Sequence, residues 1–421
     1  MASQEDLTVA QALTAVLDGV SVLPPETVSL LDALGRVLAA PVTAHDSLPP
    51  FANSSMDGYA LRAADVAEAA PDHPITLQVV ADIAAGFVSD VGIGPGMAAR
   101  IMTGAPVPAG ADAIVPVEDT NESWRGKERP LPPAIQIFRS VQPGAYVRQV
   151  GEDMLAGQTV MQSGHVLRPQ EIGVLASLGV GRVAVVKRPS VAILSTGDEL
   201  LAVDEPLTPG KIRNSNGYAQ AAQVTALGAV PLMLGIAGDT ETAVRSRLQA
   251  GLEAGVDLFV SSAGVSVGAY DVVKAVLEQE GQVGFWRVRM RPGKPLAYGR
   301  YRGVPYLGLP GNPVSAMVSF ERFARAAILK MAGHTNLERP QVLTVLQESL
   351  QSDGRESYIR AIVTRTPEGL YQATTTGSQG SHIMTSLVKA NALIIVPEGV
   401  TRVEAGEQVC AWMLDWPASV F

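Results

Sequence analysis

The chain has 421 residues, of which 47% are hydrophobic and 17% charged, and its net charge is −9. At roughly 150 residues per domain, this length predicts two to four domains, and the hydrophobic content excludes a disordered chain. No apolar run approaches the ~18 residues of a membrane span. The negative net charge disfavours non-specific nucleic-acid binding, so an anionic ligand would need a local basic cluster.

Cysteine usage and the first residues bear on the compartment. The single cysteine, Cys410, excludes an internal disulfide and a cysteine-based metal cluster. Residues 1–7 carry acidic side chains instead of a basic stretch followed by an apolar one, which argues against a signal peptide. We therefore expect a cytoplasmic protein that binds neither membrane nor nucleic acid.

The N-terminal third divides into two predicted parts. Residues 8–20 have the apolar spacing of an amphipathic helix with Thr8 as its N-cap, and the apolar stripe of 29–40 predicts a second helix that ends before Pro41. From 48 to 149, dense proline and glycine and short apolar runs predict a β-rich domain. The runs expected to supply its strands are 75–84, 98–102, 113–117, 134–138 and 145–150.

The remainder alternates predicted strands and helices before a β-rich end. Residues 158–187 predict a strand, a helix that begins near Pro169 and a second strand after Gly179. The alternation beyond them predicts a parallel sheet with helices on both faces, and the last part predicts a small β-barrel or sandwich. The expected strands are 190–195, 230–236, 257–262, 304–309, 341–346, 357–364, 392–396 and 408–414, and the expected helices are 216–228, 240–254, 271–280 and 313–332.

Three loops rich in small residues follow predicted strands, at 195–199, 261–268 and 308–315. Ligands of such sheets bind where strands end, and small residues let backbone N–H groups approach an anion. The alternative is that the glycines only make tight turns, but three such loops at one edge favour an oxyanion site. No Walker P-loop and no dinucleotide fingerprint occurs. The candidate binding residues are Ser195, Thr196, Gly197, Ser262, Gly264, Ser266, Gly268, Pro310, Gly311 and Asn312.

Acidic and basic side chains accompany these loops. Glu199, Asp239 and Asp271 each follow a predicted strand, where carboxylates suit Mg²⁺ bound to phosphate oxygens. The two aspartates could instead be helix N-caps. If 285–290 is a strand, the arginines on it share one face, and guanidinium groups match oxyanions. The alternative for this charge run is a solvated surface. Its members are Arg287, Arg289, Arg291 and Lys294.

Two strings in the N-terminal part are turns when each is considered alone. One places Asp57 beside Gly58 and Tyr59, and the other places Thr103 just after a short predicted strand. In combination with five further strings, however, they are specific. In chain order the strings are Pro49-Pro-Phe-x-Asn-Ser-Ser-Met-Asp-Gly-Tyr-Ala60, Arg100-Ile-Met-Thr-Gly-Ala-Pro106, Ser195-Thr-Gly-Asp-Glu199, Val265-Ser-Val-Gly268, Pro292-Gly-Lys-Pro295, Gly308-Leu-Pro-Gly-Asn-Pro313 and Gly377-x-Gln-Gly-Ser-His382.

From about residue 8 to 415, this order resembles the MoeA / gephyrin E-domain family of molybdopterin molybdenumtransferases. The resemblance implies an elongated connecting domain (1–47 plus 150–187), an inserted β-rich domain (48–149), a MogA-like three-layer α/β molybdopterin-binding domain (188–335) and a C-terminal β-barrel (336–421). It also implies an elongated homodimer with the cleft between subunits. The implied reaction takes adenylylated molybdopterin and molybdate, uses Mg²⁺, releases AMP and forms molybdenum cofactor. A contact with the molybdopterin adenylyltransferase is expected.

The resemblance also assigns roles to residues. Glu199, Asp239 and Asp271 would handle Mg²⁺ and the phosphates, as catalytic or metal-binding groups. The basic residues Arg287, Arg291 and Lys294 would hold molybdate or the pyrophosphate. Two groups come from outside the α/β domain: Asp57 and Thr103 would close the cleft from the partner subunit, and Arg360 and Ser381 would approach from the barrel. Asp153 is the remaining position that the family's pattern marks for substrate binding.

The sequence departs from the family pattern at a few positions. Ala263 stands where the family usually has glycine, and Arg287 and Arg291 stand where many relatives have lysine, which leaves the preference between molybdate and tungstate open. Two other functions compete with this interpretation. The adenylyltransferase of the same pathway would need only the α/β domain, and a scaffold that clusters receptors would not need the charged cleft residues. The extra domains and the retained charges favour the molybdenum-inserting enzyme.

Overall fold

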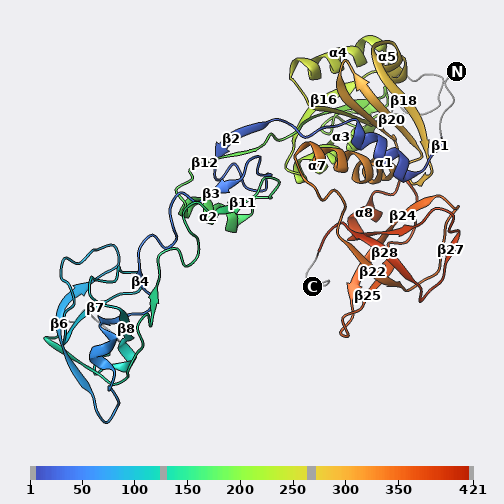
Figure 1. Cartoon of the computed structure of the whole chain (residues 1–421). Coiled ribbons are helices and arrows are strands. Elements are labelled where there is room, and N and C mark those ends of the chain that lie inside the picture. Colours follow the sequence, from blue (N-terminus) through green and yellow to red (C-terminus); the bar gives the residue numbers. More distant parts are fainter. Residues whose placement is uncertain (1–5, 124–129, 263–271, 417–421) are drawn as a thin grey trace. The chain divides into compact units, whose positions relative to one another are not determined.

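The computed structural model describes residues 6–123, 130–262 and 272–416 (Figure 1). The chain forms two compact units, one made of residues 1–40, 164–173 and 181–421 and the other of residues 41–163 and 174–180. Among the described residues, no helix has both the length and the apolar character needed to cross a membrane.

The first unit is built on a seven-stranded sheet. The neighbours β16, β13, β17 and β21 run parallel, but β20 is antiparallel to both β21 and β18, so the sheet is mixed and the fully parallel prediction was wrong. The reason is a tight hairpin between β20 and β21, in which Arg302 and Gly303 both have positive φ. In spatial order the strands are β1 (Asp6–Leu7), β18 (Gly281–Val288), β20 (Pro295–Tyr301), β21 (Val304–Leu309), β17 (Leu258–Ser262), β13 (Ser190–Thr196) and β16 (Val230–Ala237).

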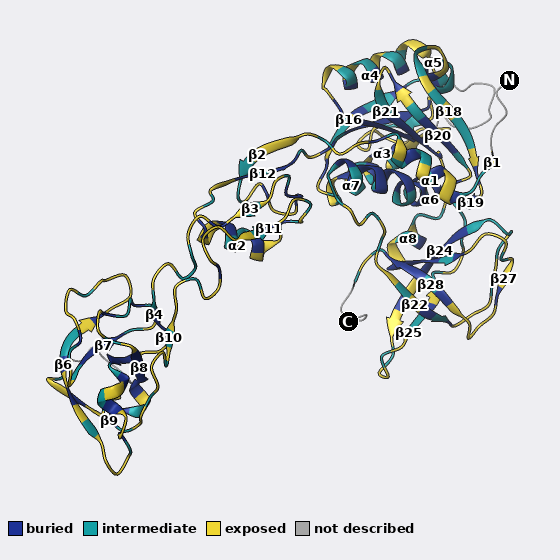
Figure 2. Ribbon diagram, viewed as in Figure 1, coloured by how far each residue is buried: buried dark blue, intermediate teal, exposed yellow. Residues whose placement is uncertain are grey.

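Helices cover both faces of this sheet, as predicted (Figure 1). Val191 and Ile193 of β13 pack into one core and Ala192 and Leu194 into the other, which is the period of two that a doubly covered strand requires. Figure 2 shows the central strands as buried. One face carries α4 (Glu241–Glu253) and α5 (Val272–Glu280); the other carries α1 (Val9–Asp18), α3 (Ser215–Ala226), α6 (Pro313–Ser319) and α7 (Arg325–Met331), the last two joined through a π-turn at Phe320–Ala324.

The N-terminal helix belongs to this sheet and not to a connecting element. Its predicted N-cap is confirmed, because Thr8 forms a capping box with Gln11. The Tyr298 hydroxyl donates to the Val16 carbonyl at 2.9 Å, and β1 pairs in parallel with β18. An apolar stripe predicts that a helix face is buried but not what covers it, so the sequence did not reveal this packing.

The second predicted helix, at 29–40, was wrong. The chain instead forms β2 (Pro25–Ser29), paired antiparallel with β12 (Arg182–Val186), and then a turn that ends at Gly35 with φ +75°. Leu34 of the supposed stripe is 46% exposed, whereas Val37 and Leu38 are buried and make isolated bridges to residues 166 and 185. The helix-like spacing of apolar residues in 29–40 therefore arose by chance from a turn followed by two isolated β-bridges.

The C-terminal part is a closed barrel, which decides between the two predicted alternatives. Five strands close in the order β24-β25-β22-β28-β26-β24, and β19 (Met290–Arg291) pairs with β24 from outside, Met290 opposite Glu356. The sequence did not predict β25 or the short elements. The barrel consists of β22 (Gln341–Leu346), β24 (Glu356–Arg365), β25 (Tyr371–Thr375), β26 (Ala392–Val396) and β28 (Gln408–Met413), with β23 (Leu350–Gln351), β27 (Arg402–Val403) and α8 (Thr385–Lys389) beside it.

The second unit contains the predicted β-rich domain. Its five-stranded sheet has the order β8-β5-β7-β6-β9, and β5 sends Tyr59 and Leu61 into one core and Ala60 into another. Strand β5 lies in the Asp57 string, where four residues were too short a run to be recognised. The strands are β5 (Gly58–Leu61), β6 (Ile75–Ile83), β7 (Met97–Ile101), β8 (Ala113–Pro116) and β9 (Ala134–Ile137). The same unit contains the two-stranded pairs β4 (Asn53–Ser54) with β10 (Val147–Arg148) and β3 (Val42–Thr43) with β11 (Thr159–Met161), and α2 (Pro169–Ser177) contributes residues to both units.

Gly299 in β20 provides a test of this packing. A Cβ there would lie 1.9 Å from the Gln282 carbonyl oxygen and 2.6 Å from the Val283 Cα, both backbone atoms of β18. We expect Gly299→Ala to destabilise the protein by about 1–3 kcal/mol because the sheet must shift to make room. Thermal unfolding would measure this, with Gly181→Ala as the control, since a Cβ at that exposed position meets no atom within 4 Å.

Candidate active site

The strands that precede the three predicted loops end at one edge of the sheet. Because β13 is parallel to β17 and β17 to β21, the strand ends at Thr196, Ser262 and Leu309 lie side by side. A cavity of about 860 Å³ lies at this edge, and residues of the barrel from 350 to 360 and from 379 to 381 line its other side. A site at the carboxyl ends of parallel strands is therefore completed by a second domain of the same unit.

The cavity concentrates positive charge. Of the described residues that line it, five are basic and only Glu199 is acidic, although the whole chain carries −9. Such an excess favours a ligand with several negative charges, because clustered cations stabilise phosphate and metal oxyanions. The basic lining residues are Arg213, Arg291, Lys294, Arg355 and Arg360.

Two helices begin at the cavity wall. The Asn214 side chain caps α3 by accepting the Gly217 N–H at 3.0 Å, and it also accepts the Ser195 hydroxyl at 2.9 Å. The N-cap of α6 is Asn312, whose side-chain amide donates to the Ser381 hydroxyl of the barrel at 3.2 Å. The start of a helix offers unpaired N–H groups and a positive dipole, both of which favour anions.

Arg360 is the buried cation of the site, with 1% exposure. Its Nε donates to the Ser386 hydroxyl at 3.0 Å and its Nη2 to the Gly380 carbonyl at 3.1 Å. Burial, and secondarily repulsion from the Arg291 charge, lowers the pKa of Arg360 to about 10. No carboxylate pairs with Arg360 among the described residues, so a bound anion would supply its missing counter-charge.

The acidic candidates differ in position. Glu199 lines the cavity, and its carboxylate folds over Gly197, whose φ is +137° and where a Cβ would lie 2.2 Å from Oε2. Asp239 does not line it: Asp198 and Asp239 each accept the other's backbone N–H, at 3.0 and 3.2 Å. The N-cap alternative for Asp239 was wrong, because Thr240 caps α4. No group of three potential metal-binding side chains occurs in the described part of the chain.

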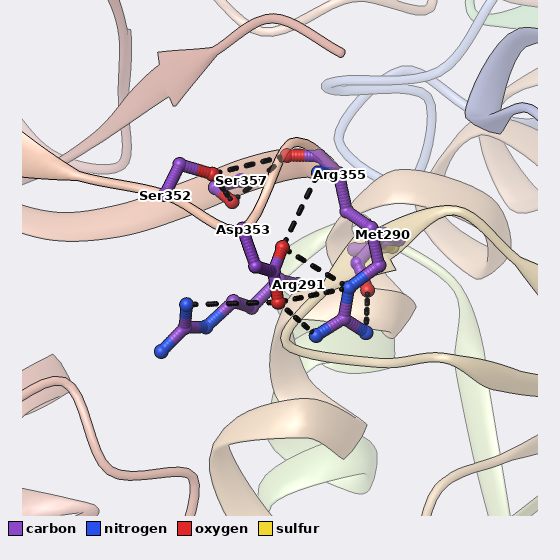
Figure 3. Close-up of polar contacts among 6 residues, drawn as sticks. All are labelled: Met290, Arg291, Ser352, Asp353, Arg355 and Ser357. Carbon is purple, nitrogen blue, oxygen red and sulfur yellow. Dashed lines mark hydrogen bonds and ion pairs between the residues drawn. The ribbon is translucent and has the colours of Figure 1, made fainter. Parts of the chain in front are cut away.

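The arginine run does not share one face as expected. Strand β18 ends at Val288 and β19 starts at Met290, so the extended strand is interrupted at Arg289. Arg289 pairs with Glu398 at 2.6 Å, whereas the Arg291 guanidinium lies 3.7 Å from Asp353 (Figure 3). Of the three arginines only Arg291 lines the cavity.

The predicted site residues fall into four groups. Ten line the cavity: Thr196, Glu199, Ser262, Arg291, Lys294, Pro310, Gly311, Asn312, Arg360 and Ser381. Four are not among its lining residues: Ser195, Gly197, Asp239 and Arg287. Gly264, Ser266, Gly268 and Asp271 lie outside the described residues, and Asp57, Thr103 and Asp153 belong to the second unit.

In that second unit, Asp57 and Thr103 are partners. The Thr103 backbone N–H and its hydroxyl both donate to Asp57 Oδ1 at 2.7 Å. Both side chains are thereby fixed at the junction of β5 and β7. Asp153 is exposed, and its backbone N–H donates to the Leu48 carbonyl at 2.9 Å.

Sequence reasoning missed part of the lining. Arg213 ends the two-residue strand β15 (Ile212–Arg213), which pairs with β14 (Leu200–Leu201). Asn214, Ser215 and Asn216 follow it, and no apolar run in the sequence marks this segment. The available signal was the Asn-Ser-Asn start of a predicted helix. Arg355 lies in a polar turn of the barrel, where nothing local distinguishes it from a surface arginine.

This architecture defines an α/β protein with a cation-lined cavity at the carboxyl edge of its sheet. Comparison with known proteins narrows it. Residues 7–179 match the MoeA N-terminal region (domains I and II), residues 192–330 a probable molybdopterin-binding domain, and residues 344–414 the MoeA C-terminal region (domain IV). The chain belongs to the molybdopterin molybdenumtransferase (MoeA) family of transferases.

Individual relatives are similar over nearly their whole length. Molybdopterin molybdenumtransferase 2 of Mycobacterium tuberculosis (strain CDC 1551 / Oshkosh) is 41% identical over 400 residues, 93% of this chain and 95% of the relative. The molybdopterin molybdenumtransferase of Bacillus subtilis (strain 168) is 37% identical, covering 94% and 92%. The crystal structure of the molybdopterin biosynthesis MoeA protein from Pyrococcus horikosii superposes with a TM-score of 0.80 at 28% identity, covering 98% and 100%.

Asn214 offers a test of the cavity wall. We expect Asn214→Ala to cost about 1–2 kcal/mol of stability, because α3 loses its cap and the Ser195 hydroxyl loses its acceptor. We also expect weaker binding of inorganic pyrophosphate, measured by calorimetry. Thr240→Ala is the matched control: it removes the cap of α4, which is not part of the cavity lining, so stability should fall while binding is unchanged. Equal loss of binding in both variants would contradict the assignment.

Proposed function

We propose that this chain inserts molybdenum from molybdate into adenylylated molybdopterin, releasing AMP and forming molybdenum cofactor in the final step of its biosynthesis. Membership of the molybdopterin molybdenumtransferase family supports the reaction class. The observation that carries the proposal is the cavity with five described cations and one described acid, since both substrates are anions.

The side chains divide the task by chemistry. Arg291 and Lys294 hold oxyanion oxygens, and Arg360 supplies a buried positive charge beside them. The start of α3 offers the phosphates its remaining backbone N–H groups and its positive dipole. Bringing a tetraoxyanion beside a polyanion is repulsive, and fixed cations lower that repulsion without reorganising. Molybdenum takes its soft ligands from the pterin dithiolene, so no cysteine is required, and Cys410 is not among the residues lining the cavity.

Mg²⁺ fits this chemistry with one carboxylate from the described chain. Glu199 faces the cavity and has no hydrogen-bond partner for its carboxylate among the described residues. A site with one or two carboxylates and several substrate oxygens suits Mg²⁺. Bound there, Mg²⁺ would neutralise phosphate charge and assist departure of AMP. Asp239 is occupied with Asp198, so we assign it the indirect role of fixing the turn that carries Glu199.

The proposal extends to assembly. We propose a homodimer in which the Asp57 and Thr103 pair of one subunit closes the cavity of the other, and a contact with the adenylyltransferase that delivers the substrate. The hydrogen bonds between the two side chains support a shared role. A cytoplasmic location stays a prediction. Molybdopterin adenylyltransferase activity is the second candidate function, because the α/β part of the chain alone would suffice for it.

Purified protein should release AMP from adenylylated molybdopterin when molybdate and Mg²⁺ are present, and far less without molybdate. Lys294→Gln should lower kcat/KM by about 10²-fold because one fixed positive charge is removed from the cavity. The control is Lys389→Gln, which removes an exposed charge of α8 that does not line the cavity. Consumption of ATP and free molybdopterin without AMP release from the adenylylated form would favour the adenylyltransferase.

Removal of Mg²⁺ by a chelator should abolish AMP release, and added Mg²⁺ should restore it. Glu199→Gln should raise the Mg²⁺ concentration needed for half-maximal rate about tenfold or more, because the amide keeps the size but loses the charge. Titration of the rate with Mg²⁺ measures this. An unchanged Mg²⁺ requirement in a folded Glu199→Gln protein would remove Glu199 from the metal site.

A further inference from the structure

One carboxylate lies beside two arginines that line the cavity. Asp353 belongs to the turn between β23 and β24 of the barrel, directly across from β19 of the α/β part (Figure 3). Strands β19 and β24 pair in this region, with Met290 opposite Glu356 and Arg291 opposite Ser357. The turn is therefore anchored to the backbone that carries Arg291.

Arg355 braces this carboxylate. Its Nε donates to both Asp353 oxygens, at 3.2 and 3.1 Å, and its Nη2 donates to Oδ2. Its Nη1 crosses to the α/β part and donates to the Met290 carbonyl at 3.1 Å. Every nitrogen of the Arg355 guanidinium is thus engaged within the protein, and a bidentate pair of this kind fixes both partners geometrically. Arg355 lines the cavity, and three of its five N–H donors are engaged within the protein.

Arg291 is held more loosely. Its Nη1 lies 3.7 Å from Asp353 Oδ2, an ion-pair distance beyond hydrogen-bond length, and its side chain is 48% exposed. Its donors remain available to a ligand. The Arg291 charge also lowers the pKa of buried Arg360, so the two guanidinium groups repel each other. Hydrogen bonds from Arg355, and less strongly the Arg291 charge, hold the pKa of Asp353 below its usual value, so the carboxylate stays ionised at neutral pH.

We propose that Asp353 is a positioning residue: braced by Arg355, it holds the Arg291 guanidinium at the cavity mouth, against repulsion from Arg360, in place to receive an oxyanion substrate. This inference rests on the proposed function for the identity of the anion, molybdate. Neither Asp353 nor Arg355 is needed to contact the ligand. Asp353 and Arg355 affect the ligand only through the position of Arg291.

The sign of one substitution separates positioning from simple charge. Asp353→Asn removes a negative charge beside the cavity, so a purely electrostatic effect would tighten anion binding. Loss of positioning would weaken it, because Arg291 would no longer be held near the site. We expect molybdate to bind roughly threefold to fivefold more weakly, the scale of a partly exposed ion pair. Asp353→Glu should restore much of the affinity.

The test is calorimetric titration of the full-length protein with molybdate, which does not depend on turnover, accompanied by circular dichroism to confirm folding. Glu398→Gln is the matched control: it removes the carboxylate that pairs with Arg289 at the same junction, and neither residue is among those lining the cavity. Its affinity should equal that of the unmodified protein. In an Arg291→Gln background, Asp353→Asn should change the affinity no further, since Asp353 acts through Arg291.

Tighter or unchanged molybdate binding in Asp353→Asn would overturn the inference, as would an undiminished effect in the Arg291→Gln background. An equal loss in Glu398→Gln would also overturn it, because the junction as a whole would then be responsible. Absence of molybdate binding by the unmodified protein would overturn the assignment of the anion. The proposed function fails separately, if adenylylated molybdopterin, molybdate and Mg²⁺ yield no AMP while molybdate still binds.

Discussion

The parallel pairing of β13 with β17 and of β17 with β21 is the constraint on which the site depends. It forces three chain segments, far apart in sequence, to end their strands at one edge. Strand β18 then runs to the same edge and the chain returns along the antiparallel β20, so the segment between those two strands carries Arg291 and Lys294 to that edge. Pairing of β19 with β24 places the barrel against it.

Concentrating cations in this way has an electrostatic cost when no substrate is bound. The protein limits that cost differently at three of the arginines that line the cavity. Arg355 is neutralised by Asp353, Arg360 is stabilised by a hydroxyl and a carbonyl while its pKa falls, and Arg291 retains exposure to water. A ligand with several negative charges would reduce the repulsion among all of these cations at once. The cavity would therefore recognise its ligand by charge more than by apolar contact.

The sequence predicted the elements whose period is long and regular, and it predicted that β13, β17 and β21 would deliver their loops to one edge. Two kinds of feature escaped it. Antiparallel β20 escaped because a two-residue hairpin leaves no helix-length gap, and residues 29–40 were misassigned because Val37 and Leu38 are buried by bridges that no local pattern encodes. Arg213 and Arg355 escaped because their importance comes from tertiary position. The place of Asp271 in the site stays a prediction.

The ladder between β2 and β12 has a topological consequence. Its two antiparallel strands hold residues 29 and 182 opposite each other, so the whole second unit, together with the short returns around 164–173, is formally one very long loop within the first. Closing such a loop costs entropy that grows only logarithmically with its length. Insertions or deletions inside it therefore alter the free energy of the first unit very little. In polymer terms, the inserted part can vary in size almost independently of the domain that holds the cavity.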